Sequence, residues 1–489
     1  MPTPRRRAHA RARLRRVPAP ALQRASRTAA SPATLPEPPL AEAFEKQICE
    51  WLAAAQGRLP VPARTRGRPP VLPAMLLWTA MLVAIVRGFA SCRDLWRLIS
   101  QQGLWHHPRI EVSDMAIYHR LERTSPESLC AFFELVSALL AEQFRDRSAV
   151  PLAKRFAGLF AIDVTVLDPL LRHLNVLRGV PPGAHELLGG ALACLFDLRR
   201  QQWRKVLYRQ NPMENEKPSA PELVAELPAG SLVLADLGYF AFAWFDYLRE
   251  RGLHFVSRLR EGTTFTVLHE LYRGGNARVQ LSERVVYLGT AVDSRAAYPV
   301  RLIEVERQDA SGSVSLRRYI TDLLDPRLLP AWEVVGLYAY RWDIESAFKL
   351  LKGKLGLHLL WSAHRNALLQ QLYATLILCE MLLTFRFEIA EQAKADLREV
   401  SVELMLRWLP QLAASGEDPV ARFVAMGRAA GFIRPFRGVR YEVPQVPDDA
   451  YQRPPEPPPP RAPRYRNKDR NPLVTHLEAT LRARFAPNS

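Results

Sequence analysis

Several features that mark other classes of protein are missing from this sequence of 489 residues. Its five cysteines are scattered without a Cys-x-x-Cys pair, and their number is odd, so neither a disulfide framework nor a zinc cluster is indicated. The apolar run Val71–Val86 has sixteen residues, fewer than the roughly 20 that span a bilayer, and we expect it to be a buried helix. These absences favour a reducing cytoplasm over secretion or a membrane.

Acidic residues are almost absent from residues 1–40, which contain nine arginines and a single acid, Glu37. Because Pro, Ala and Arg leave little to bury, we expect this segment to be a disordered basic arm. An organellar transit peptide is the alternative, but the segment lacks an amphipathic apolar stripe. The formal charge of the whole chain is +18, and a basic surface of this size attracts polyanions, most commonly nucleic acid.

The hydrophobic fraction of 48% is sufficient for two or three domains, each with a buried core. The pattern is helical from residue 41 to 148, where Thr124-Ser125-Pro126-Glu127 combines a capping hydroxyl, a first-turn proline and an acid. Strands and helices then follow in the order β-β-β-α-β-α-β. We expect them at Leu159–Leu167, Ala191–Leu198, Trp203–Tyr208, Ala220–Glu226, Ser231–Ala235, Ala241–Arg251 and His254–Leu259.

The rest of the chain first interrupts this alternation and then resumes it. Several β-like stretches with glycine turns between Phe265 and about Thr321 predict an inserted β subdomain. Helical patterns return at Ala331–Leu355 and Ala367–Arg386, and the proline-rich basic residues 452–472 predict an extended, polyproline-like tail. The expected domains are the basic arm 1–40, a helical domain 41–148, an α/β core 149–262 and 323–412, a β insertion 263–322, and a C-terminal region 413–489.

Four reactive side chains share one side of the helix expected at Ala331–Leu355. At about 100° per residue, Tyr338, Arg341, Glu345 and Lys352 fall within a stripe about 60° wide, beside an apolar edge. A carboxylate flanked by cations and a phenol fits phosphate chemistry, because the acid can hold a divalent metal while Arg and Lys bind phosphate oxygens. An ordinary amphipathic helix with solvated charges would show the same pattern.

The spacing Tyr338-x2-Arg341-x3-Glu345-x6-Lys352 resembles the Tyr-Arg-Glu-Lys signature of bacterial insertion-sequence transposases of the DDE class, in the IS-four group. Trp342 and Ile344 also look like that family. The resemblance implies a ribonuclease-H-like core with an inserted β subdomain, preceded by an all-helical N-terminal domain. It also implies that Glu345 is the third of three catalytic acids, and that the first two lie on strands of the core sheet or just after them.

Two aspartates match the expected first and second acids. Asp163 lies inside the apolar run expected to form the first strand, where an isolated carboxylate is costly unless it binds a cation or another partner. Asp236 follows the strand Ser231–Ala235, at the carboxyl edge where α/β sheets place ligands. Either one alone could be a turn-forming or capping aspartate, and Asp168 competes with Asp163 for the first role.

Three convergent carboxylates favour Mg²⁺ or Mn²⁺, and we expect two ions that activate a water or a DNA 3′-hydroxyl and stabilise the leaving oxygen. The resemblance implies that Tyr338, Arg341 and Lys352 hold a phosphate at the transposon end. It further implies a strand transfer that passes through a hairpin. Arg258 resembles the family's strand-ending arginine near the DNA, although it could be one of many surface cations.

The expected function is cut-and-paste transposition, in which a homodimer acts on the terminal inverted repeats of an insertion sequence and on target DNA, in the cytoplasm of a bacterium and associated with its nucleoid. Ser113–Leu121 could present Arg120 to a DNA groove, or be a surface helix. Arg66-Gly67-Arg68-Pro69 could enter a minor groove, or be a linker. The alternative functions are a catalytically silent transposase-derived regulator and a stand-alone ribonuclease-H-like nuclease.

Overall fold

The structure of the chain is a computed structural model, and its described residues begin after position 70. They are residues 71–486 except 105–107, 151, 153, 168–188, 213, 291–293, 310, 358, 363, 414–417, 436–442, 453–455 and 467–470. Three expectations lie outside them: the basic arm 1–40, the tetrapeptide Arg66-Gly67-Arg68-Pro69 and the competing acid Asp168.

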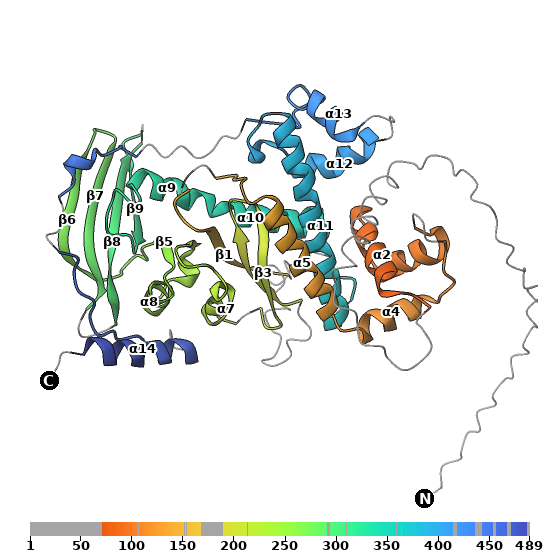
Figure 1. The fold of residues 1–489 in the computed structure, drawn as a ribbon, viewed down its shortest axis with the longest axis horizontal. Coiled ribbons are helices and arrows are strands. Elements are labelled where there is room, and N and C mark those ends of the chain that lie inside the picture. The colour runs from red at the N-terminus through yellow and green to blue at the C-terminus, as the bar shows by residue number, and fades with distance from the viewer. Residues whose placement is uncertain are drawn as a thin grey trace, which may run out of the picture. The chain divides into compact units, whose positions relative to one another are not determined.

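The centre of the fold is one mixed sheet of nine strands in the order β3-β2-β1-β4-β5-β9-β8-β7-β6 (Figure 1). Its first five strands are β1 (Leu159–Val166), β2 (Ala191–Asp197), β3 (Gln202–Arg209), β4 (Leu232–Ala235) and β5 (His254–Arg258). Strand β1 pairs antiparallel with β2 and parallel with β4, which is in turn parallel to β5. With α7 (Ala220–Val224) before β4 and α8 (Phe242–Glu250) before β5, this arrangement confirms the expected ribonuclease-H-like core.

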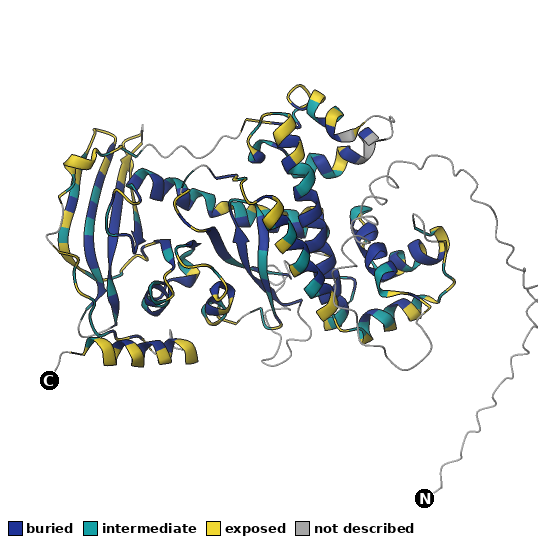
Figure 2. Ribbon diagram, in the orientation of Figure 1, coloured by how far each residue is buried: buried dark blue, intermediate teal, exposed yellow. Residues whose placement is uncertain are grey.

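Both faces of the core sheet are covered, because alternate residues of its strands point to opposite sides. On β1, Leu159 and Ala161 join the larger apolar cluster, which includes residues of the long C-terminal helices. Phe160 and Ile162 join a second cluster with residues of α7 and α8. The strands are buried along most of their length (Figure 2), so the pattern along β1 decides which layer each side chain meets.

The β insertion continues the core sheet. Its four antiparallel strands are β6 (Phe265–Gly275), β7 (Val279–Gly289), β8 (Arg295–Gln308) and β9 (Val314–Thr321). Strand β9 pairs with β5 through Val256–Thr321, Ser257–Ile320 and Arg258–Tyr319. The segment expected as a separate insert therefore extends the same hydrogen-bonded sheet to its far edge.

The helix expected at Ala331–Leu355 is divided into three parts. They are α9 (Ala331–Tyr340), α10 (Trp342–Lys349) and the π-helical turn η6 (Leu350–Lys354). The expectation of one uninterrupted helix was wrong, because Arg341 forms a turn between α9 and α10 and the π-helical hydrogen bonds shift the register of Lys352. Figure 1 shows α9 and α10 following each other across the sheet.

Helix α11 (Arg365–Gln392) is the longest of the described helices, and the helices α2, α4 and α5 pack against it. It is long and apolar enough to cross a membrane by length and composition alone, but 83% of its most apolar window is buried inside the protein. The N-terminal helices are α2 (Ala74–Val86), α3 (Cys92–Arg97), the π-helical turn η1 (Leu98–Gln102), α4 (Asp114–Arg123) and α5 (Glu127–Gln143). Most of the run Val71–Val86 thus forms a buried helix, as expected, but the helix begins at Ala74 and Val71 is exposed.

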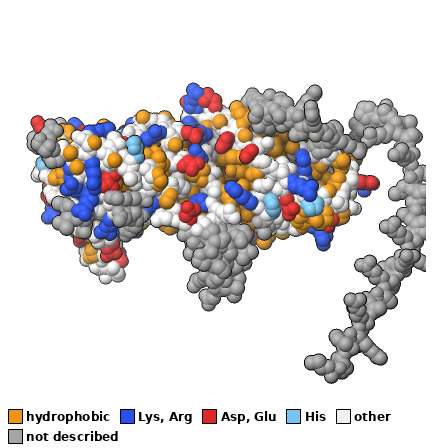
Figure 3. All heavy atoms as spheres, turned by 90° about the horizontal axis from the view of Figure 1, so that it is seen from below, with side chains coloured by type: hydrophobic (Ala, Val, Ile, Leu, Met, Phe, Trp, Pro, Cys, Tyr) orange, Lys and Arg blue, Asp and Glu red, His pale blue; other side chains and the backbone are white. Residues whose placement is uncertain are grey.

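The C-terminal region is more ordered than its composition predicts. It contains α12 (Val402–Ala413), α13 (Pro419–Met426) and α14 (Pro472–Phe485), and residues 456–466 run along the β insertion. Basic residues of this stretch bind the protein itself: Arg464 and Arg295 exchange backbone hydrogen bonds, and the Arg461 side chain donates to Ala296 O and Leu288 O. Lys and Arg side chains gather at the end of the face in Figure 3 where the β insertion lies.

Candidate active site

The two candidate aspartates are neighbours because of the register of β1 and β4. These parallel strands pair from Leu159–Leu232 to Ile162–Ala235, so Asp163 and Asp236 are the next residues in both. Neighbouring strands lie about 4.8 Å apart, and parallel strands end at the same edge of a sheet. The register therefore brings together two acids that are 73 residues apart in the sequence.

Asp163 faces the layer of α10, on the same side of β1 as Thr165. Its side chain is only 15% exposed, and its Oδ1 accepts a hydrogen bond of 2.8 Å from the Val164 N–H. Burial raises the pKa of Asp163 to about 7, helped by the negative charges of Asp236 and Glu216, while the Val164 N–H and Arg341 oppose the rise. A carboxyl with such a pKa is only partly ionised near neutral pH, and a nearby cation would stabilise its ionised form.

Asp236 also caps the short 3-10 turn η5 (Leu237–Tyr239), since its Oδ1 accepts a 2.7 Å hydrogen bond from the Gly238 N–H. The capping role and the position beside Asp163 therefore coexist. A Cβ at Gly238 would lie 2.9 Å from Asp236 Oδ1 and 2.6 Å from Glu216 Oε2, so a fourth carboxylate borders the same space. Burial and the charge of Asp236 raise the pKa of Glu216, whereas Arg209 lowers it.

Glu345 lies on α10 and shares an arginine with Asp163. Arg341 Nη2 is 2.9 Å from Glu345 Oε1, and Arg341 Nη1 is 3.8 Å from Asp163 Oδ2. The guanidinium is 9% exposed and lies 5.7 Å from the Tyr338 ring and 5.2 Å from the Trp342 ring. Arg341 thus links the acid of the helix to the acid of the strand.

The other residues of the helical signature also reach this edge of the sheet. Lys352 Nζ donates a 2.7 Å hydrogen bond to Thr165 Oγ1, two residues beyond Asp163. The Tyr338 ring stands edge-on to Tyr319 at 5.5 Å, and burial raises the pKa of its hydroxyl to about 12. Arg258, exposed at the end of β5, acts electrostatically on Tyr338. Seven of the eight residues predicted for the site therefore lie at or near this edge of the sheet.

Arg120 is the predicted site residue that lies elsewhere. It belongs to α4, whose Ser113 cap accepts a hydrogen bond from the Ala116 N–H, and α4 packs against α3 and α11. Within the described residues, no hydrogen bond or ion pair joins Arg120 to the acids. Any contact of Arg120 with DNA would therefore be separate from the acids.

The acids fit a divalent cation in chemistry, although the described residues do not gather three of them around one point. Asp163, Asp236 and Glu345 offer only oxygen donors, which Mg²⁺ and Mn²⁺ prefer. In the part of the chain that the structure describes, no three His, Cys, Asp or Glu side chains are close enough to hold one ion. Mg²⁺ commonly binds one or two carboxylates and completes its coordination shell with water and substrate phosphate, so Asp163 and Asp236 suit it. Glu345 differs, because Arg341 occupies the space beside it.

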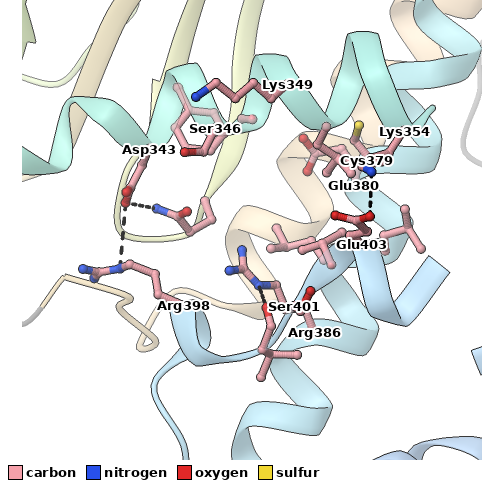
Figure 4. A pocket seen from close by; sticks show the side chains of 18 of the residues that line it. Asp343, Ser346, Lys349, Lys354, Cys379, Glu380, Arg386, Arg398, Ser401 and Glu403 are labelled. Atoms are coloured by element: carbon pink, nitrogen blue, oxygen red, sulfur yellow. Dashed lines mark hydrogen bonds and ion pairs between the residues drawn. The ribbon is translucent and has the colours of Figure 1, made fainter. Parts of the chain in front are cut away.

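A cavity of about 470 Å³ lies on the opposite side of α10 (Figure 4). Asp343 lines it, and this residue is two positions from Glu345, about 200° around the helix axis. Asp343 Oδ2 accepts a 2.9 Å hydrogen bond from Gln201 Nε2 and lies 3.8 Å from Arg398 Nε. These two contacts connect α10, the helix that carries Glu345, to the β2–β3 turn and to the segment before α12.

Sequence reasoning missed Glu216 and Tyr239. Glu216 stands in a polar loop two residues from Glu214, and nothing in the sequence distinguishes the two acids. Tyr239 is three residues beyond Asp236, and its hydroxyl is buried without a hydrogen-bond partner among the described residues. The glycine at 238 was the available signal, because it permits the close approach of two carboxylates.

Known proteins resemble this chain around the same residues. Residues 189–380 match the family model described as the transposase DDE domain, a segment that contains Asp236 and Glu345 and begins after Asp163. A putative transposase of Sinorhizobium fredii is 27% identical over 154 residues, which cover 31% of this chain and 41% of that protein.

Two further relatives are transposases of named insertion sequences. The transposase for IS231E from Bacillus thuringiensis is 24% identical over 165 residues, or 32% of this chain and 34% of that protein. The transposase InsG for IS4 from Escherichia coli is 26% identical over 149 residues, or 28% and 30%. The chain thus spans less than half the length of the curated relatives it matches.

Among solved structures, the piggyBac transposase synaptic complex with hairpin DNA matches at a TM-score of 0.36 and 9% identity, over 83% of this chain and 85% of that one. The family model and the three curated relatives all describe transposases. The chain is therefore a relative of the bacterial insertion-sequence transposases of the DDE class.

Proposed function

We propose that this chain is a DNA transposase that cuts the ends of an insertion sequence and joins them to target DNA, with Asp163, Asp236 and Glu345 as its catalytic acids. The supporting observation is the meeting of two strand ends with α10, where Arg341 contacts both Asp163 and Glu345. The relationship to insertion-sequence transposases supports the same activity.

The acids would hold Mg²⁺ or Mn²⁺, in our proposal two ions. When bound, such ions supply Lewis acidity that activates an attacking oxygen and stabilises a leaving oxygen at phosphorus. Asp163 and Asp236 would hold the cation from the rigid sheet, which fixes their carboxylates relative to each other. Glu345 would join them from the helix after it separates from Arg341.

The cations beside the acids would bind the DNA backbone. Arg341 presents a planar fork that pairs with a phosphate as well as with a carboxylate, so an incoming phosphate competes with Asp163 and Glu345 for it. Lys352 is hydrogen-bonded to Thr165, beside the same acids. Tyr338 and the exposed Arg258 would extend this phosphate-binding surface along the β9 side.

The DNA substrate in this proposal is the pair of terminal inverted repeats, recognised by a homodimer that also captures target DNA. Helix α4, with Arg120, is the candidate for groove contacts, because it is short, capped and partly exposed. The net charge of +18 supports a nucleic-acid partner and predicts binding that weakens with salt.

The test uses purified full-length protein, Mg²⁺ and DNA that carries the terminal repeats of its own element. We expect nicking at the repeat ends by the wild-type protein, and binding without nicking by Asp236→Ala and Glu345→Ala. An Arg407→Ala variant, changed on the exposed side of α12, is the matched control and should cut normally.

Each other outcome points to a different function. Nicking that survives Glu345→Ala would overturn the site. Repeat-specific binding by the wild-type protein without any cleavage would indicate a regulator, and cleavage without preference for the repeats would indicate a nuclease.

A further inference from the structure

Glu216 brings a fourth carboxylate to the edge where Asp163 and Asp236 meet. A Cβ built on Gly238 would lie 2.6 Å from Glu216 Oε2 and 2.9 Å from Asp236 Oδ1, so both oxygens border one small space. The negative charges of Asp236 and Glu216 both act electrostatically on the Asp163 carboxyl. Three carboxylates therefore act on one another at this edge, and Glu345 is not among them.

The position of Glu216 is fixed by the loop between β3 and α7. Arg209, 9% exposed at the end of β3, donates to the Asn215 carbonyl oxygen and pairs with Glu214 at 3.2 Å. Glu216 then begins the 3-10 turn η4 (Lys217–Ser219), where the Ser219 hydroxyl donates to its carbonyl oxygen at 2.8 Å. The loop thus holds the backbone of Glu216 while its side chain extends towards Gly238.

The charge of Glu216 is only partly compensated, because Arg209 acts on it from a distance and is shared with Glu214. No donor hydrogen-bonds to its carboxylate, and the guanidinium of Arg209 is engaged with Glu214 and Asn215. Carboxylates that share a site repel one another unless a proton or a cation lies between them. The carboxylates of Glu216 and Asp236 therefore repel each other without a hydrogen-bond donor or an ion pair at Glu216 among the described residues.

The hydroxyl of Tyr239 independently points to a missing partner. Tyr239 is 1% exposed, its hydroxyl has no hydrogen-bond partner among the described residues, and it lies within the field of Glu216, Asp163 and Asp236. A buried hydroxyl without a hydrogen-bond partner destabilises the fold, because it has lost its hydrogen bonds to water without replacement. A hydrated cation between the carboxylates would satisfy both features, since it neutralises the acids and offers water to the hydroxyl.

We propose that Glu216 is a fourth oxygen ligand of the divalent-cation site, beside Asp236. This inference rests on the proposed function, because it assigns an additional ligand to the same site. It distinguishes Glu216 from Glu214, which has the same chemistry two residues earlier and is 53% exposed.

The test measures Mn²⁺ binding to the full chain without DNA, by electron paramagnetic resonance of the free ion, together with thermal unfolding in EDTA. Glu216→Gln should weaken Mn²⁺ binding about tenfold or more, and should raise the unfolding temperature in EDTA because it removes a repulsive charge. Glu216→Asp should retain part of the affinity. Glu214→Gln is the matched control and should bind Mn²⁺ like the wild-type protein.

The two measurements separate a ligand from a structural residue. If Glu216 only supported the loop, Glu216→Gln would unfold at a lower temperature in EDTA, and that result, or wild-type Mn²⁺ affinity, would overturn the inference. Asp236→Asn tests the underlying site: if it weakens Mn²⁺ binding while Glu216→Gln does not, only the fourth ligand is rejected. If neither variant changes Mn²⁺ binding, the proposed active site itself fails.

Discussion

Arg341 occupies the space between Asp163 and Glu345, at 3.8 Å from one carboxylate and 2.9 Å from the other. Burial lowers the pKa of a guanidinium, but Tyr338, Glu345 and Asp163 together raise the pKa of Arg341 above its usual value. The same positive charge restrains the rise in the pKa of Asp163. In the proposed site, a divalent cation would therefore compete with Arg341 for the same oxygens.

At the scale of this residue, we expect Arg341→Gln to bind Mn²⁺ several-fold more tightly than the wild-type protein without DNA, because a competing positive charge is gone. The measurement belongs at about pH 8.5, above the pKa of about 7 of Asp163, where its carboxylate is ionised in wild-type protein. Affinity for DNA carrying the repeat ends should fall, because a phosphate contact is lost. Arg407→Gln is the control, and equal or weaker Mn²⁺ binding by Arg341→Gln would contradict the competition.

At the scale of elements, α11 is attached to the core sheet through a buried acid. Glu380 on α11 accepts hydrogen bonds of 3.0 Å from the Trp203 N–H and from Gln202 Nε2 on β3. Burial raises the pKa of Glu380 to about 8, against the two hydrogen bonds that lower it. The contribution of Glu380 to stability is therefore complete below about pH 4.5 and is lost as the pH rises towards 8.

In the wild-type protein, ionisation of Glu380 should lower the unfolding free energy by about 1 kcal/mol for each pH unit between pH 5 and 8. We expect Glu380→Gln to remove this part of the pH dependence, because its side chain does not ionise. The new amide can donate to Gln202 Oε1, which has no hydrogen-bond partner among the described residues. Urea unfolding at several pH values measures the effect, with Glu134→Gln on the exposed side of α5 as the control. A variant with the same pH dependence as the wild-type protein would show that Glu380 does not titrate in this range.

The order of elements was predictable because it depends on local patterns. The apolar runs of β1 to β5 and the turn signals between them are properties of short segments, and the structure confirms the expected β-β-β-α-β-α-β order. The break at Arg341 was not predictable, because the residues on both sides favour a helix. Two contacts with the sheet lie at the break. Arg341 contacts Asp163 on β1, and Asp343 accepts a hydrogen bond from Gln201 in the β2–β3 turn.

At the scale of the whole molecule, the C-terminal residues join the β insertion to the core. The Tyr465 hydroxyl donates a 2.7 Å hydrogen bond to Asp246 Oδ2 on α8, and the same oxygen accepts from the Ala297 N–H on β8. All three residues are buried. A segment whose composition predicts an extended basic tail therefore closes a junction between α8 and the inserted strands.

We expect Tyr465→Phe to lower the unfolding free energy by about 1–3 kcal/mol, because Asp246 loses a donor inside the protein. Urea unfolding measures this change, and Mn²⁺ binding should stay at the wild-type value because Tyr465 is not in the candidate site. Tyr272→Phe on β6 is the control. Equal unfolding midpoints for Tyr465→Phe and the wild-type protein would mean that the C-terminal segment does not stabilise the fold.

Local sequence patterns are enough to locate most strands and helices, and to show that two acids follow or interrupt apolar strands while a third lies on a helix. These are local properties, since the hydrophobic periodicity and the presence of an acid in an apolar run can be read within a few residues. The pairing of β9 with β5, the position of Arg341 between Asp163 and Glu345, and the approach of Glu216 rather than Glu214 to Asp236 are visible in the folded chain alone. Such proximities depend on the register of neighbouring strands and on loop conformation, which join residues far apart in the chain.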